Sequence, residues 1–178
     1  MNIKKSDYIK ITSVIIITLY LIYCLRSLEN FHFVSGINLV IHEAGHSILI
    51  FFGQFISTLG GSLFQVAVPL LFAGYFFIKR DIYSSGIILL WVGESIIEVA
   101  RYASDAIVMR LPLLGGEGVI HDWNWLFSYT NLLNHTSSIA SAIYFVGVLT
   151  MVGGVWISLY SVWRSVKYGD GVDVLGVE

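Results

Sequence analysis

Apolar residues are gathered along the chain into five segments that short polar or glycine-containing stretches separate. The five segments cover residues 8–28, 33–53, 63–78, 82–109 and 138–163. A bilayer requires about 17–25 predominantly apolar residues of each spanning helix, and the segments lie near this length. The pattern therefore predicts a single all-α domain over residues 1–178, built as a polytopic bundle of transmembrane helices with four to five membrane segments.

Two stretches between and after these segments are polar. Residues 110–135 contain glycine, proline and charged positions, and they are predicted to form the one long polar loop. Residues 166–178 are predicted to form a solvated tail.

The distribution of basic residues constrains the topology, because lysine and arginine favour the cytoplasmic side of a membrane. The basic groups are Lys4/Lys5/Lys10, Lys79/Arg80 and Arg164/Lys167. They share one side only if the short third segment enters the membrane and returns. We therefore expect four crossings plus a re-entrant segment at residues 60–78, with five plain crossings as the alternative.

Composition agrees with this picture and narrows the partners. The chain is 56% hydrophobic and 12% charged, and its mean hydropathy is +0.78. A soluble domain carries about 25% charged residues. We expect a multi-pass protein of the cell membrane, with membrane lipid as its surroundings. A net charge of −2 without a basic run argues against a nucleic-acid partner.

The second segment contains the sequence His-Glu-Ala-Gly-His at residues 42–46, inside an otherwise apolar stretch. Residues four apart share one face of a helix, so His42 and His46 can present two imidazoles to one metal ion. Glu43 points about 100° away and can reach a water on that metal instead. Two imidazoles, a carboxylate base and an open position are typical of a zinc hydrolase. The alternative is an inert polar cluster in a membrane helix.

The fourth segment carries a stripe of charge. Glu94, Glu98, Arg101 and Asp105 fall within a narrow arc of a helical wheel. Such a stripe cannot face lipid, so we expect it to face the helix with the histidines. Arg101 and Glu98 are predicted to form a structural pair, and Asp105 to act as a metal ligand or as an acceptor for a metal-bound histidine.

A catalytic zinc needs a third protein ligand. His121 and Asp122, in the tryptophan-containing part of residues 110–135, are the main candidates beside Asp105, and Glu94, Glu98 and Glu117 are further ones. In the third segment, Gln65 and Pro69 are candidates for presenting a substrate segment by strand-like pairing. A proline-bent packing helix is the alternative there.

The HEAGH motif resembles that of the site-2 protease-type intramembrane zinc metalloproteases, and the chain looks like a small diverged member. In that family a later membrane segment supplies an aspartate as the third zinc ligand, and members cut peptide bonds within or near the bilayer. The family's second signature, ending in Leu-Asp-Gly, is absent here. Its nearest substitutes are Asp105 and the His121-Asp122 pair. Glu94 and Glu98 also resemble, faintly, the glutamate motif of CAAX-processing zinc proteases.

These observations predict a membrane-embedded zinc metalloprotease, a hydrolase of membrane or juxtamembrane peptide segments. His42 and His46 would bind Zn²⁺ with a third ligand from His121, Asp122 or Asp105, and Glu43 would act as general base. The alternatives are a membrane protein that binds metal, or uses the polar pocket as a receptor or transport site, without hydrolysis, and a structural subunit.

Overall fold

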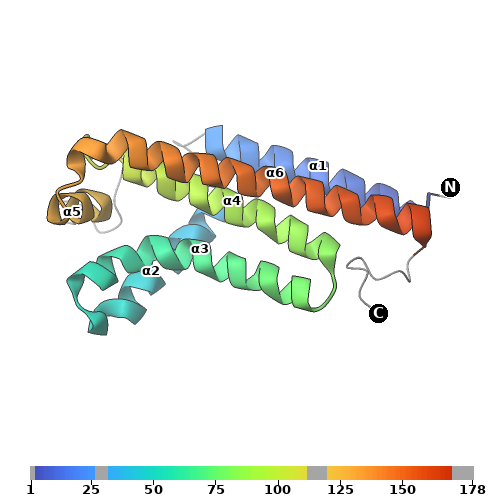
Figure 1. Ribbon diagram of the computed structural model, residues 1–178, viewed down its shortest axis with the longest axis horizontal. Coiled ribbons are helices and arrows are strands. Elements are labelled where there is room, and N and C mark those ends of the chain that lie inside the picture. The colour runs from blue at the N-terminus through green and yellow to red at the C-terminus, as the bar shows by residue number, and fades with distance from the viewer. Residues whose placement is uncertain (1–2, 27–31, 112–119, 170–178) are drawn as a thin grey trace.

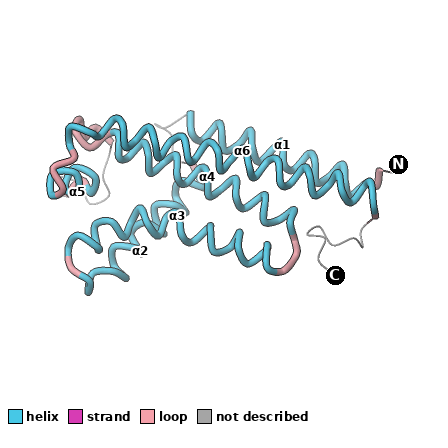
Figure 2. Tube along the Cα trace, viewed as in Figure 1, coloured by secondary structure: helices cyan, strands magenta, loops and turns pink. Residues whose placement is uncertain are grey.

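The protein is a bundle of helices. The computed structural model describes residues 3–26, 32–111 and 120–169, and no strand occurs among them (Figure 2). The elements are α1 (Lys5–Arg26), α2 (Phe33–Leu49), η1 (Ile50–Phe52), α3 (Gln54–Ile78), α4 (Ile82–Ser104), α5 (Asp122–Tyr129), η2 (Leu133–His135) and α6 (Thr136–Tyr168). The predicted all-α class is confirmed.

Five helical stretches are long and apolar enough to cross a membrane: α1, α2 with η1, α3, α4, and η2 with α6. Large apolar side chains remain exposed along them, as expected where lipid takes the place of water. On α6, for example, Phe145 and Trp156 are exposed. The described part of the chain is therefore consistent with a membrane protein.

The third predicted segment is longer than the sequence suggested. Helix α3 begins at Gln54 and runs without a break for 25 residues, with Pro69 inside it. The break lies instead at Gly53, whose φ of 87° favours glycine. Gly60 and Gly61, which suggested a turn, are buried within the helix. Residues 60–78 thus belong to a continuous helix that begins at Gln54.

Other boundaries also shift. The fourth segment, predicted to residue 109, ends as a helix at Ser104. Asp105 follows it, and its carboxylate accepts hydrogen bonds from the backbone N–H groups of Arg110 and Leu111 at 3.1 and 2.9 Å, which turns the chain. The predicted loop over residues 110–135 contains α5, and residues 112–119 lie outside the described part. Helix α6 extends to Tyr168 and Gly169 follows it, so the first residues of the predicted tail are helical. Residues 170–178 of that tail lie outside the described part of the chain.

Helices α1, α4 and α6 lie side by side, and α2 and α3 form a second layer against α4 (Figure 1). The start of α1, the turn between α3 and α4 and the end of α6 all lie toward one end of the molecule (Figure 1). The three basic groups therefore share that end. Helix α2 lies toward the other end of the molecule, where α5 is found (Figure 1).

Small residues allow α4 and α6 to pack closely. A β-carbon at Gly86 would lie 2.9 Å from the carbonyl oxygen of Gly154, and one at Gly93 would lie 2.7 Å from that of Gly147. The two glycines on each helix are seven residues apart, so both contacts fall on one face. Close glycine contacts of this kind stabilise helix association in lipid, where the hydrophobic effect does not drive helices together. They make α4 a fixed support for the polar residues described next.

Candidate metal centre

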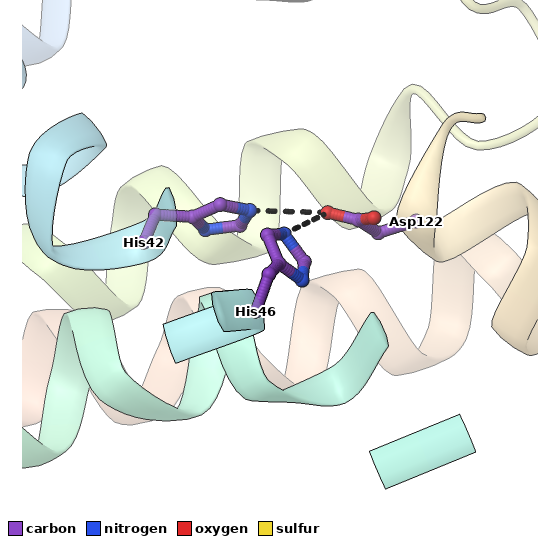
Figure 3. Close-up of side chains that lie close together, drawn as sticks. All are labelled: His42, His46 and Asp122. Carbon is purple, nitrogen blue, oxygen red and sulfur yellow. Dashed lines mark hydrogen bonds and ion pairs between the residues drawn. The ribbon is translucent and has the colours of Figure 1, made fainter. Parts of the chain in front are cut away.

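Two histidines from α2 and one aspartate from α5 converge on a single point. The Nε2 atoms of His42 and His46 lie 3.0 and 3.2 Å from the same carboxylate oxygen, Oδ2 of Asp122 (Figure 3). One ligand atom from each of the three residues lies within 4.8 Å of the others, close enough to hold one metal ion. The helical spacing of His42 and His46 brings their rings together, with centroids 4.7 Å apart.

Asp122 reaches the histidines because α5 is anchored beside them. Its own backbone N–H donates to the hydroxyl of Tyr102 on α4 at 3.1 Å. The indole N–H of Trp123 donates to the buried hydroxyl of Ser62 on α3 at 3.1 Å. The side-chain amide of Asn124 donates to the carbonyl of Ala106 at 2.8 Å. These three bonds tie the first turn of α5 to α3, to α4 and to the chain that follows α4.

Asp122 is held in its charged form. Burial alone would raise the pKa of this carboxyl, but the hydrogen bonds from His42 and His46 outweigh burial and lower the pKa to about 2. The site therefore offers a permanent negative charge between two imidazoles.

The far side of each imidazole is also bonded. Nδ1 of His46 lies 2.8 Å from the carbonyl oxygen of Ser57, and Nδ1 of His42 lies 3.2 Å from the side-chain carbonyl oxygen of Gln65. Both partners are acceptors, so each Nδ1 donates to its partner whenever Nε2 binds a metal ion through its lone pair. In the neutral ring this places the lone pair on Nε2, the atom that faces Asp122. Metal-binding histidines are oriented in this way by their surroundings.

Gly61 on α3 forms the floor of the site. A β-carbon at this position would lie 2.4 Å from Nε2 of His42 and 2.5 Å from Nε2 of His46. The neighbouring Gly60 lies against Gly45, where a β-carbon would be 2.2 Å from the Gly60 carbonyl oxygen. Glycine is therefore needed both for the approach of α2 to α3 and for the space in front of the two ligand atoms.

Glu43, the predicted base, is half-buried beside this group. It directly follows His42 in α2 and precedes His46 by three residues. Among the described residues it makes no hydrogen bond or ion pair, so its carboxylate is not committed to a structural partner there.

Two of the candidate third ligands lie outside the group. The ring of His121 caps the start of α5, where Nδ1 accepts the backbone N–H of Asn124 at 3.2 Å. Its Nε2 lies 3.5 Å from a carboxylate oxygen of Asp105. Burial lowers the pKa of His121, and the Asp105 carboxylate opposes this effect. His121 and Asp105 thus form a pair of their own behind the site, and Glu117 lies outside the described residues.

The charged stripe of α4 faces α2 only at its first two residues, Glu94 and Glu98. Glu98 accepts hydrogen bonds from Ser35 and Asn38, and Glu94 accepts one from Asn38. The expected pairing of Arg101 with Glu98 is not formed as a direct ion pair. The Arg101 guanidinium donates instead to the backbone carbonyl of Leu25 at the end of α1, at 2.8 Å.

The residues proposed to hold a substrate segment have other surroundings. Gln65 contacts His42 and Glu98, and it is buried. Pro69 is fully buried one turn further along α3. Neither offers a free edge for strand-like pairing, because both lie inside a continuous helix.

Comparison with known proteins adds nothing to this geometry. No protein family, curated protein or solved structure matches the chain. The interpretation therefore depends on the chemistry of the residues themselves.

The donor set fits zinc. Two imidazole nitrogens and one carboxylate oxygen are ligands that Zn²⁺ takes in catalytic sites, where a fourth position stays open. The sequence did not single out Gly61, Ser57 or Tyr102 as parts of the site. Gly61 and Gln65 are four residues apart and share one face of α3, and this spacing was the signal available for finding them.

Proposed function

We propose that this protein is a multi-pass membrane zinc metallopeptidase that hydrolyses peptide bonds in or near the bilayer. The proposal combines the HEAGH motif, which resembles that of site-2 protease-type enzymes, with the three-residue centre. His42, His46 and Asp122 would hold the zinc ion. The five apolar helices support a substrate that is itself a membrane or juxtamembrane segment.

One observation carries the metal assignment. All four ring nitrogens of His42 and His46 face oxygen atoms: Nδ1 faces a carbonyl in each case, and Nε2 faces Asp122. A neutral imidazole has one N–H, so it satisfies only one of its two acceptors. Protonating both rings would satisfy every acceptor but would place two positive charges next to each other, with the ring centroids 4.7 Å apart. A divalent cation among the two Nε2 atoms and the carboxylate satisfies every group.

The residues of the chain then divide the catalytic work. When bound, zinc would polarise the scissile carbonyl and lower the pKa of a water to about 7. Glu43 would take a proton from the attacking water and deliver it to the leaving amine. Ser57 and Gln65 would keep both imidazoles turned toward the metal, and Gly61 would leave room in front of them.

The proposal is tested with the purified protein in lipid nanodiscs. Zinc content is measured by elemental analysis, and cleavage of single-span peptides carrying a fluorophore and a quencher is followed. We expect His46→Ala to lose zinc and cleavage, and Glu43→Gln to keep zinc but lose cleavage by about 100-fold or more. His135→Ala is the matched control, because His135 is exposed and makes no capping hydrogen bond at the start of α6.

The outcomes separate the alternatives. Zinc in the wild type without cleavage of any peptide would favour a metal-binding protein without hydrolytic activity. Wild-type protein without stoichiometric zinc, or unchanged cleavage by Glu43→Gln, would remove the metallopeptidase mechanism.

A further inference from the structure

A chain of hydrogen bonds connects His42 to a carboxylate on another helix. The side-chain carbonyl of Gln65 on α3 lies 3.2 Å from Nδ1 of His42. The amide nitrogen of the same Gln65 donates to Oε2 of Glu98 on α4 at 3.1 Å. Gln65 is therefore a bridge between a proposed metal ligand and a charged group that does not touch the metal centre.

The direction of this chain follows from which groups can only donate or only accept. The indole N–H of Trp91 is a donor, and it bonds the side-chain oxygen of Asn38 at 2.7 Å. The amide nitrogen of Asn38 must then face acceptors, and it lies 2.6 Å from Glu98 and 2.9 Å from Glu94. The orientation of the Asn38 side-chain amide is thus fixed independently of Gln65.

Glu98 fixes the second amide. Three donors surround its carboxylate: the Ser35 hydroxyl at 2.7 Å, the Asn38 amide at 2.6 Å and the Gln65 amide at 3.1 Å. Three donors offset the cost of burying one negative charge, and the nearby charge of Arg101 acts on Glu98 as well. An ionised carboxylate only accepts, so Gln65 must turn its amide nitrogen to Glu98 and its carbonyl to His42.

We propose that Glu98, acting through Gln65, is a positioning residue that fixes the N–H of His42 on Nδ1 and so directs the Nε2 lone pair to the metal. The inference rests on the proposed zinc site. It assigns a function to the charged stripe of α4, namely orientation of a ligand on α2 by way of α3. Partners of this kind alter metal affinity by about 10–100-fold when they are removed.

An exchange of the two side chains tests the proposal. Glu98→Gln keeps the size of the side chain, but an amide at position 98 can donate or accept, so Gln65 is free to reverse. Gln65→Glu places two carboxylates against each other. The double variant Gln65→Glu/Glu98→Gln restores one acceptor toward His42 and one donor behind it. We expect zinc affinity to fall about 10–100-fold in Glu98→Gln and to return to within about threefold of wild type in the exchange.

Two measurements are made on the full chain in nanodiscs. Zinc affinity is read by competition with a chromogenic chelator, and the Nδ1–H of His42 is followed by nitrogen-15 NMR of the zinc-loaded protein. We expect this N–H signal to be sharp in the wild type and the exchange, and broadened or shifted in Glu98→Gln. Glu94→Gln is the control. Glu94 lies one turn earlier on α4 and, among the described residues, forms no hydrogen bond to Gln65.

The results distinguish this inference from the proposed function. Zinc binding without peptidase activity would refute the peptidase and leave the positioning role intact. Wild-type protein that binds no zinc would overturn both. If zinc binds, two results would overturn the positioning role. The first is an exchange variant whose zinc affinity is no higher than that of Glu98→Gln. The second is a Glu94→Gln protein that shows the same zinc affinity and the same His42 signal as Glu98→Gln. Should Glu98→Gln fail to fold, Gln65→Met, which removes both the acceptor for His42 and the donor to Glu98, must show the same loss of affinity.

Discussion

Adding one methyl group to the floor of the site provides a sharp test of the metal centre. In Gly61→Ala the new β-carbon lies 2.4 Å from Nε2 of His42, 2.5 Å from Nε2 of His46 and 2.6 Å from Cδ2 of His42. These are the two nitrogen atoms that would bind zinc. The change alters no charge and removes no hydrogen-bonding group, so its effect on zinc comes from space alone.

The expected magnitude follows from the distances. Moving from 2.4 Å to an ordinary contact of 3.4 Å requires a displacement of about 1 Å, whereas metal–ligand distances tolerate only about 0.2 Å. Moving α3 away from α2 would relieve the contact only by giving up the close packing of Gly60 against Gly45 and the bond between Ser57 and His46. Both rings must therefore leave their positions. We expect zinc affinity to fall by at least about 100-fold, which corresponds to about 2.7 kcal/mol.

Helix stability cannot explain such a loss, because alanine is a better helix residue than glycine by about 1 kcal/mol. The matched control is Gly74→Ala on the same helix, where nothing lies within 4 Å of the new β-carbon. Zinc affinity is measured by chelator competition, and thermal unfolding is followed in parallel. A Gly61→Ala protein that binds zinc as tightly as Gly74→Ala would refute the placement of the ion between the two Nε2 atoms.

Three further substitutions have distinct expected outcomes. Asp122→Asn keeps the side-chain volume but loses the charged ligand, so zinc content should fall well below one per chain by elemental analysis. His121→Asn should keep full zinc content, since asparagine can accept the Asn124 N–H as the cap and His121 is not a ligand; zinc loss would contradict this. Trp123→Phe leaves the buried Ser62 hydroxyl without its donor, which should cost about 1–3 kcal/mol and lower the melting temperature. An unchanged melting temperature would show that this bond does not anchor α5.

The sequence predicts the part of the site that is local. The spacing of His42 and His46 within one apolar helix places both rings on one face, and that relation needs no knowledge of the rest of the fold. The five apolar stretches likewise predict the helices, because length and hydropathy are properties of each segment alone. Predictions of this kind agree with the structure within a few residues at most helix ends.

The contribution of α3 could not be predicted in the same way. Gly60 and Gly61 suggest a turn when the sequence is considered alone, since glycine weakens a helix. In the fold their missing side chains allow α2 to approach and leave space for the imidazoles. Once α3 is known to start at Gln54, Gln65 falls on the same face as Gly61 and meets His42 rather than a substrate. From a single sequence, a glycine that ends a helix cannot be distinguished from a glycine that allows a neighbouring helix to pack closely.

The choice of third ligand depends on where α5 begins. His121 is the capping residue, with extended backbone angles of −75° and 111°, and its ring is committed to the N–H of Asn124. Asp122 is the first residue inside the helix, so its side chain projects in another direction, toward α2. The bonds of Trp123 to α3 and of Asn124 to the chain after α4 then set the rotation of the first turn. If α5 began one residue later, each of these side chains would point about 100° away from its present direction. The proposed ligand is therefore selected by the docking of α5, a contact between segments some 60 residues apart that no local pattern encodes.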